Sequence, residues 1–504
     1  MSQPALQKTL NLTGVTVNAM ALIAPGAFLW LTYQLQAAQT DITGASTALD
    51  TWAGVGLALI LAFMTAASYS QLAELYPEAG TGSSYYFAER AFLDHQQGKL
   101  QKWARLAKYS AGWLSHLYYW VYPGVMVAML ATLVAYISGQ FGVELSIPVQ
   151  VIVAVVASLL TGYIAFRGVN GSTTSALVIN VIQIVTLVAV TVLAISYRVL
   201  NPDHVTFVHT TALDVIRPHS FSGVLFQSTI AILLMVGFES ATALAAEATS
   251  IKHVSRGVLL SLVIQGLMFY LFEYFGVGFF VNGEGYAAAA KSSAPVGDMV
   301  KVLGDSLLGG SGFVLMVVVA TSVAVAVFGS ALACMNTGVR VTYAMGRDGE
   351  VPTILGLLHG RFSTPHYSVL LMSVVSALIG GFGVISLRNL TAVTLLSNIG
   401  TFLIYGFTNL VAFVAFFKTK QFSVMRHAVL PLAGLVVNVA MLLAVIVLGI
   451  MGGGDSRVAA LIAMVGAALW IIVGVGYLVL NSARLGRSVW STSEAGTWAD
   501  NGAR

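Results

Sequence analysis

Twelve separate stretches of this sequence are long and apolar enough for each to cross a lipid bilayer as a helix. A membrane span needs about 20 predominantly apolar residues. The stretches lie near 13–37, 52–74, 112–138, 147–166, 173–196, 223–246, 257–281, 312–338, 365–385, 390–417, 428–451 and 457–480. Helices are expected because lipid offers no partner for a free backbone amide. The alternating ten-residue segments of a membrane β-barrel are absent from the sequence. The sequence therefore predicts an all-α integral membrane protein with twelve transmembrane helices.

The composition agrees with a chain whose main solvent is lipid. Of the 504 residues, 57% are hydrophobic and 9% are charged, whereas roughly a quarter of the residues in a soluble domain are charged. No polar stretch is long enough for a soluble domain, so we expect one transmembrane domain of twelve helices over 1–481 and a polar cytoplasmic tail over 482–504. The net charge of +4 forms no basic face, which argues against nucleic acid as a partner.

The basic residues are distributed unevenly between the loops on the two sides of the predicted bundle. Loops on the side of the N-terminus contain 18 of the 24 Lys and Arg residues, and loops on the other side contain 6. Cytoplasmic loops of membrane proteins carry the excess of Lys and Arg. We therefore expect a multi-pass protein of the cell membrane with both termini in the cytoplasm. The segment KLQKWARLAKYSAGW (99–113) mixes basic and aromatic residues and predicts a helix that lies on the anionic inner leaflet.

Neither a metal nor a cofactor is expected. Cys334 is the only cysteine, which excludes a disulfide within the chain and any site built from several cysteines. The outer loop 197–222 contains His204, His209 and His219, but their spacings of five and ten residues do not match a helical pair of metal ligands.

Two acidic residues lie deep within apolar stretches, Glu239 in the sixth span and Glu273 in the seventh. A charge at bilayer depth costs about 2.5–3.5 kcal/mol on insertion scales, so such a group faces a cavity, forms a pair or stays protonated. No Lys or Arg lies within a predicted span to act as a partner. For Glu273, which is surrounded by aromatic residues, we expect a neutral acid that is hydrogen-bonded to a neighbouring helix. For Glu239 we expect a functional role in binding a proton.

The backbone around Glu239 has a counterpart in the first span. Pro25 and Gly26 interrupt the first span about halfway along, and Gly237 does the same in the sixth. Interrupted helices at corresponding places in two halves of a membrane protein point to a transporter binding site. The free amides at one side of such a break attract anions, and the free carbonyls at the other side attract cations.

Four motifs resemble those of the amino acid–polyamine–organocation (APC) superfamily. They are SYSQLAELYPEAGTGSSYYFAERAF (68–92), RGVNGS (167–172), MVGFESATALAAEA (235–248) and RVTYAMGRDGEVP (340–352). The resemblance covers about the whole chain. It implies a fold in which spans 1–5 and 6–10 form inverted repeats, over about 13–197 and 223–417, with helices 1 and 6 broken and helices 11 and 12 appended. It also implies an amino acid or amine substrate that binds between the two broken helices.

The resemblance assigns candidate roles by position. Ile23, Ala24, Pro25, Gly26 and Ala27 would bind the carboxylate of the substrate through the backbone. Gly237, Phe238 and Ser240 would line the amine side, with Phe238 as a lid. Tyr119, Tyr122 and Met126 of span three would face the site, with helix packing and an interfacial position as the alternatives. Glu239 matches an acidic position that the resemblance associates with proton sensing.

The chain also departs from the family pattern. Ala24-Pro25-Gly26 replaces a common Gly-Ser-Gly, which removes one amide and one hydroxyl from the carboxylate side. Thr186 occupies the place of a lysine that substitutes for sodium in some members, and Leu233 occupies the place of a gating tryptophan in the arginine/agmatine antiporter. A second group, Thr321, Ser322 and Ser330 in span eight, offers possible sodium ligands, but we favour hydroxyls bonded to their own helix.

The expected function is secondary active transport of an amino acid or related amine by alternating access, with proton symport through Glu239. An exchanger of amino acids or amines is the main alternative. A sodium-coupled carrier, a membrane-embedded enzyme, a channel and a sensor that has lost transport are further alternatives. The substrate and the oligomeric state stay open.

Overall fold

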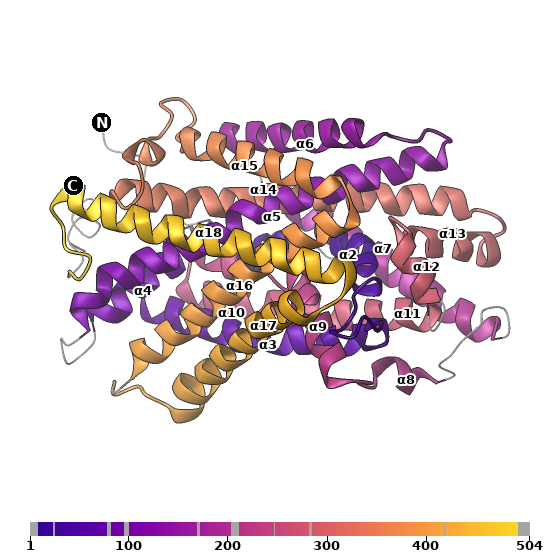
Figure 1. Cartoon of the computed structure of the whole chain (residues 1–504), viewed down its shortest axis with the longest axis horizontal. Coiled ribbons are helices and arrows are strands. Elements are labelled where there is room, and N and C mark those ends of the chain that lie inside the picture. The colour runs from indigo at the N-terminus through magenta and orange to yellow at the C-terminus, as the bar shows by residue number, and fades with distance from the viewer. Residues whose placement is uncertain are drawn as a thin grey trace.

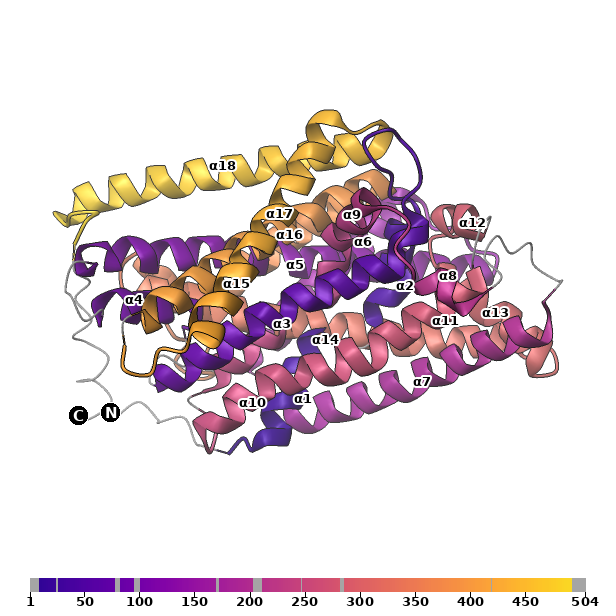
Figure 2. The same cartoon turned by 90° about the horizontal axis from the view of Figure 1, so that it is seen from below.

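The computed structural model describes residues 9–23, 26–77, 82–94, 100–168, 172–202, 211–245, 247–281, 285–417 and 419–491. In these ranges the chain forms a bundle of long helices (Figures 1 and 2), and apart from two isolated backbone bridges it contains no β structure. Eleven helical segments are long and apolar enough to cross a bilayer, and the shorter apolar helix Leu12–Ile23 begins the remaining span. The predicted all-α membrane fold is confirmed.

The expected spans appear in chain order, and the first and sixth are interrupted. Span one consists of α1 (Leu12–Ile23) and α2 (Ala27–Ala37). Span six consists of α9 (Phe221–Ala231) and two short 3₁₀ segments, η4 (Ile232–Leu234) and η5 (Phe238–Leu244). Span seven consists of α10 (Ile251–Leu262), the π-helical segment η6 (Val263–Tyr270) and α11 (Leu271–Val281). The other spans are α3 (Thr51–Leu75), α5 (Ala104–Gln140), α6 (Ile147–Arg167), α7 (Ser172–Leu200), α14 (Gly312–Arg347), α15 (His366–Val384), α16 (Leu387–Phe416), α17 (Leu430–Met451) and α18 (Gly454–Leu485).

Short helices mark the two ends of the bundle. The helix α4 (Ser84–Leu93) lies at one end, where α5 begins and α18 ends, and we call this the α4 end (Figures 1 and 2). The helices α8 (Ala212–Ile216), α12 (Gly285–Lys291) and α13 (Pro295–Leu307) lie at the other end, which we call the α13 end. Figure 2 shows α7 and α18 along opposite edges of the bundle.

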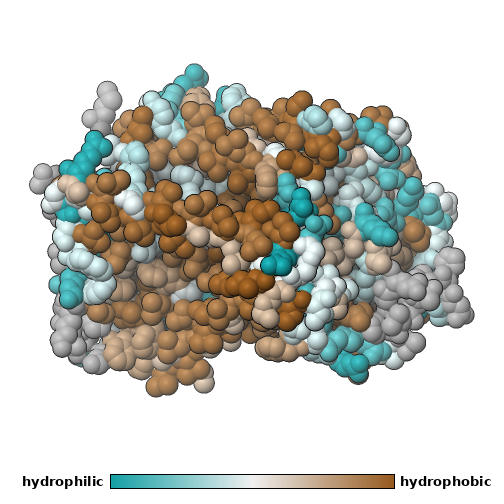
Figure 3. Space-filling view, viewed as in Figure 1, coloured by the Kyte–Doolittle hydropathy of each residue, from teal (hydrophilic) through white to brown (hydrophobic). Residues whose placement is uncertain are grey.

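The surface between the two ends is apolar. Figure 3 shows hydrophobic residues over most of the middle of this face and hydrophilic residues mainly toward its sides. Large apolar side chains are exposed on several outer helices, as at Ile152 (59%), Val185 (63%), Val436 (66%) and Ile472 (65%). An exposed apolar surface of this extent would aggregate in water, so the face belongs in lipid.

A close approach between α5 and α16 determines which side chains meet at the centre of the bundle. A Cβ atom on Gly400 of α16 would lie 2.7 Å from the backbone nitrogen of Tyr118 in α5, so only glycine permits this packing. The approach brings Tyr405 of α16 and Tyr119 of α5 within hydrogen-bond reach of Glu239 in span six.

The start of α5 corrects the expected helix on the membrane surface. Residues from Ala104 onward belong to the long helix that forms span three, and Arg105 and Lys108 are buried with exposures of 3% and 6%. Arg105 donates two hydrogen bonds to Glu350, of 2.8 and 3.0 Å. Lys108 donates a hydrogen bond of 2.9 Å to Glu89 and also pairs with Asp348. Arg105 and Lys108 therefore do not face lipid, because acidic residues of the 68–92 and 340–352 motifs pair with them inside the protein.

Candidate substrate and coupling site

The first span is interrupted at the predicted place. The helix α1 ends at Ile23 and α2 begins at Ala27, and Gly26 between them has a left-handed φ of 73°. A Cβ atom on Gly26 would lie 1.5 Å from Cδ1 of Leu187 in α7, so both the backbone conformation and the packing require glycine. Ala24 and Pro25 lie outside the described residues.

The sixth span is interrupted at Gly237 and contacts the break in the first. Gly237 has a φ of 127°, which separates η4 from the 3₁₀ segment that begins at Phe238. A Cβ atom on Gly237 would lie 2.9 Å from the backbone nitrogen of Ile23 and 2.8 Å from a side-chain carbon of Leu22. The two breaks therefore meet each other in the interior of the bundle, as the prediction of a shared site requires.

The free carbonyl groups at the end of α1 are occupied by donors from other spans. The last carbonyls of a helix have no partner within the helix and need one elsewhere. Four side chains from spans three, seven and eight supply it here. Gln265 donates to Met20 O (2.9 Å), Ser330 to Ala21 O (3.2 Å) and Leu22 O (3.0 Å), Tyr122 to Leu22 O (3.4 Å), and Tyr270 to Ile23 O (3.0 Å).

The hydroxyl groups of span eight follow two patterns. Thr321 and Ser322 donate to carbonyls of their own helix, Val317 O and Val319 O, both at 2.8 Å. These two residues match the expected self-bonded arrangement. Ser330 differs because its hydroxyl reaches across to α1.

Glu239 lies at the centre of the site with an exposure of 1%. Three donors satisfy its carboxyl oxygens: the hydroxyl of Tyr405 at 2.8 Å, the amide of Gly237 at 3.0 Å and the hydroxyl of Tyr119 at 3.3 Å. A carboxylate can accept several such hydrogen bonds, while a protonated carboxyl would have to donate one of its own. The surroundings therefore contain partners for the ionised form although they lie at membrane depth.

Aromatic rings surround the lid candidate and the acid. The ring of Phe238 lies 5.2 Å from that of Tyr405 and 5.9 Å from that of Tyr69. The hydroxyl of Ser84, in α4, donates a hydrogen bond of 2.6 Å to Tyr69. A chain of contacts thus connects Glu239 to the α4 end of the bundle.

The remaining candidates are buried, but they do not all face Glu239. Ile23, Tyr119, Tyr122, Met126, Phe238 and Ser240 have exposures between 0% and 7%. The hydroxyl of Ser240 donates to Gly237 O at 2.6 Å, so it supports the break itself, and Tyr122 contacts α1. Met126 is fully buried and makes no polar contact in any described hydrogen bond. In this conformation the candidate residues have almost no exposure to solvent.

Two residues of the site were missed in the sequence. Tyr69 lies within the 68–92 motif, and its place there was the only available signal. Tyr405 lies in the largely apolar stretch TFLIYGF, which contains no signal for a hydrogen-bond partner of an acid.

Glu273 does not have the hydrogen bond expected for it. Its side chain is completely buried in α11, and neither carboxyl oxygen has a hydrogen-bond partner among the described residues. The tyrosines on either side do have partners, because Tyr270 donates to Ile23 O and Tyr274 donates to Oε1 of Gln36 at 2.6 Å. The expectation of a hydrogen-bonded acid was therefore wrong for the described part of the chain.

Two touching helix breaks within a bundle of membrane-spanning helices are typical of a membrane transport protein. The sequence profile of the amino acid permease family matches residues 8–484. The chain belongs to this family, and with it to the APC superfamily that its motifs resemble.

Characterised relatives share a quarter of the residues with this chain. A branched-chain amino acid permease of Lactococcus lactis is 26% identical over 342 residues, covering 65% of this chain and 67% of the relative. A low-affinity putrescine importer of Escherichia coli K12 is 26% identical over 417 residues, covering 81% of each chain. A methylthioribose transporter of Bacillus subtilis is 23% identical over 361 residues, covering 69% of this chain and 71% of the relative.

Proposed function

We propose that the protein is a secondary active transporter that moves an amino acid or a related amine across the cell membrane by alternating access. The contact between the breaks at Ile23 and Gly237 carries the proposal, because interrupted helices at corresponding places in two halves of a membrane protein point to a transporter binding site. The repeats span about 13–197 and 223–417, residues 482–504 form a cytoplasmic tail, and both termini lie in the cytoplasm. The relatives named for branched-chain amino acids and putrescine support this substrate class.

In this proposal the substrate lies between the two breaks. The backbone of 23–27 binds its carboxylate where it has one, and Gly237, Phe238, Ser240 and the span-three residues Tyr119, Tyr122 and Met126 form the opposite wall. Pro25 removes one amide from the carboxylate side. This loss is compatible with substrates that have no carboxylate, such as the amine named for the Escherichia coli relative.

Proton symport is the proposed coupling, with Glu239 as the group that exchanges the proton. Its carboxyl group is buried, accepts three hydrogen bonds and forms no ion pair with Lys or Arg among the described residues. A group of this kind can change its charge when the conformation changes its surroundings. Exchange of one substrate for another is the second candidate.

The carbonyl groups at the end of α1 favour a proton rather than a sodium ion as the coupling ion. A sodium ion in a broken-helix transporter is coordinated by such free carbonyls. Here the carbonyl oxygens of Met20, Leu22 and Ile23 each accept a hydrogen bond from a side chain of spans three, seven or eight. A cation at these oxygens would compete with the donors that already bind them.

Uptake into proteoliposomes with an imposed pH gradient tests the proposal. We expect an inward proton gradient to drive accumulation of the substrate identified in a screen of amino acids and amines. Glu239→Gln should lose the dependence on the gradient, while Glu273→Gln, which also replaces a fully buried acid, should keep it. Uptake that requires substrate inside the vesicles would indicate exchange. An unchanged pH dependence in Glu239→Gln would overturn the coupling role.

A further inference from the structure

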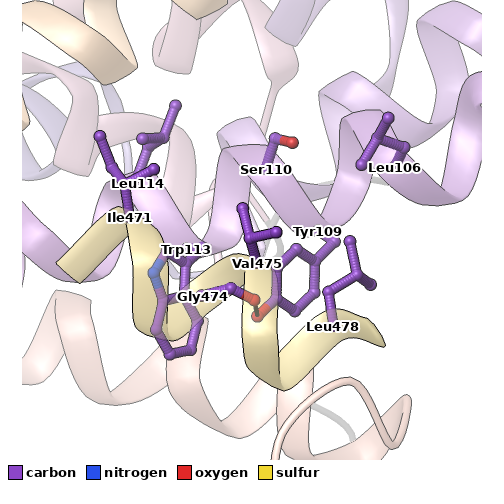
Figure 4. Close-up of a pocket in the computed structure, with 9 residues that line it drawn as sticks. All are labelled: Leu106, Tyr109, Ser110, Trp113, Leu114, Ile471, Gly474, Val475 and Leu478. Atoms are coloured by element: carbon purple, nitrogen blue, oxygen red, sulfur yellow. Dashed lines mark hydrogen bonds between the residues drawn. The ribbon is translucent and has the colours of Figure 1, made fainter. Parts of the chain in front are cut away.

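A groove on the outer surface separates the first turns of α5 from the last turns of α18. It has a volume of about 140 Å³ and is lined by Leu106, Tyr109, Ser110, Trp113, Leu114, Ile471, Gly474, Val475 and Leu478 (Figure 4). This volume is close to that of an engineered apolar cavity of about 150 Å³ that binds benzene. The groove therefore has room for a short length of hydrocarbon chain.

The lining offers almost nothing to a polar ligand. The hydroxyl of Tyr109 donates to Gly474 O at 2.8 Å, and the indole NH of Trp113 donates to Trp470 O at 2.9 Å, so these two polar groups are already occupied and Ser110 is the one other polar side chain of the lining. Ile471 and Val475 have exposures of 41% and 58% on the outer side of α18. The groove thus opens toward lipid and is unrelated to the buried site at Glu239.

Positive charge lies just beyond the groove at the α4 end. Lys102 precedes the groove residue Leu106 by about one helical turn, and Arg484 follows Leu478 by fewer than two turns; both are exposed. The acidic side chains nearby form ion pairs inside the protein: Glu350 pairs with Arg105, and Glu89 and Asp348 share Lys108. The rings of Trp103 and Trp490 lie 4.4 Å apart at the same level, and tryptophan is typical of the membrane–water interface.

From this arrangement we propose that the groove binds one acyl chain of an anionic glycerophospholipid, whose headgroup lies against Lys102 and Arg484. The charge of the mouth selects the anionic headgroup, since each basic residue near a membrane surface contributes about 1 kcal/mol of attraction. The bound chain fills the space between α5 and α18. It adds to the contacts of Arg105, which donates to Ser482 at 3.0 Å and to Ser488 O at 2.9 Å at the end of α18.

Native mass spectrometry of the delipidated protein, titrated with phosphatidylglycerol or phosphatidylcholine of the same acyl chains, tests the proposal. We expect one tight phosphatidylglycerol site in the wild type. Val475→Trp fills the groove and should remove this site. Val465→Trp is the matched control, because Val465 lies on the same helix with the same exposure of 58% but does not line the groove. Equal binding by the two variants would overturn the proposal.

The headgroup contact has its own test. In Lys102→Gln combined with Arg484→Gln, the preference for phosphatidylglycerol over phosphatidylcholine should fall by about fivefold for each cation removed. Binding of phosphatidylcholine should be unchanged, because the acyl groove is intact. A preference equal to that of the wild type would show that these cations do not bind the headgroup, and would overturn the proposal.

Discussion

The hydroxyl of Tyr405 lies 2.8 Å from Oε2 of Glu239, although 166 residues separate the two in the chain. Tyr405 belongs to the tenth span and Glu239 to the interrupted sixth, so this hydrogen bond connects the interrupted span to a continuous helix. A movement of span six relative to α16 would change the number of donors around the acid. Such a movement would couple the proposed protonation of Glu239 to the conformation of the bundle.

Tyr405→Phe is expected to shift the pH dependence of uptake. A hydrogen bond to a charged group contributes about 1.5–3 kcal/mol, so its loss should move the midpoint of the uptake profile by roughly one pH unit or more toward the alkaline side. Tyr118→Phe is the matched control, because the hydroxyl of Tyr118 has no hydrogen-bond partner among the described residues. The same shift in both variants would show that the hydrogen bond from Tyr405 is unimportant.

Replacing sodium by choline in the external buffer is expected to leave uptake unchanged, because the α1 carbonyls already accept hydrogen bonds. Ser330→Ala removes the donor to Ala21 O and Leu22 O. It should lower the free energy of unfolding by about 1 kcal/mol, since Ala21 O loses its side-chain donor while Leu22 O keeps the hydrogen bond from Tyr122. Uptake that rises with sodium concentration in the wild type would contradict the inference that the α1 carbonyl groups bind no sodium ion.

Gly237→Ala is expected to abolish transport and to destabilise the protein. Its φ of 127° strains any side chain by about 1–3 kcal/mol, and the new Cβ would lie 2.9 Å from the backbone of Ile23. Gly56→Ala is the control, since no atom lies within 4 Å of a Cβ built there and the residue is helical. This control should be neutral or stabilising by up to about 1 kcal/mol. If Gly237→Ala matched the wild type in transport and in thermal melting, the inference that the helix is interrupted at Gly237 would be refuted.

Arg105→Met is expected to lower the free energy of unfolding by about 3–5 kcal/mol, because it leaves Glu350 buried at 4% exposure without its partner. The double variant Arg105→Met with Glu350→Leu should recover part of this loss, since it removes both charges. Arg388→Met provides the surface comparison: Arg388 pairs with Asp455 at 3.7 Å, and the side chains are 45% and 80% exposed. The cost there should stay below about 1 kcal/mol. Equal thermal shifts for the two single variants would contradict the buried pair.

Glu273→Met is expected to raise the melting temperature. The carboxyl group of Glu273 is fully buried and has no hydrogen-bond partner among the described residues, so an apolar side chain of similar size removes a polar group that is costly to bury. Gln265→Met is the contrasting variant. Gln265 donates to Met20 O at 2.9 Å, so its replacement should lower the melting temperature. A lower melting temperature for Glu273→Met would indicate a partner in another conformation.

Features that depend on neighbours along the chain could be read from the residues themselves. The apolar stretches predicted the spans because crossing a bilayer requires a fixed length of apolar helix. Gly26 and Gly237 marked the two breaks, since the backbone conformation of a glycine is a local property. Glu239 was identified because an acid within an apolar stretch is evident without any knowledge of the fold.

Features that depend on distant segments could not be read in this way. Arg105 and Lys108 had the pattern of a membrane-surface helix, yet acidic residues of two distant motifs bury and neutralise them. Glu273 was expected to have a hydrogen-bond partner, and the structure offers none among the described residues.

The sequence alone determined a helical membrane protein with two interrupted spans, because hydropathy and backbone conformation act over a few residues at a time. The tertiary structure alone decided that the two breaks touch, that Tyr405 and Tyr119 donate to Glu239, and that a groove opens between α5 and α18. These contacts arise from the packing of helices that lie far apart in the chain. Their geometry depends on close approaches such as that of Gly400 to Tyr118, which no local pattern records.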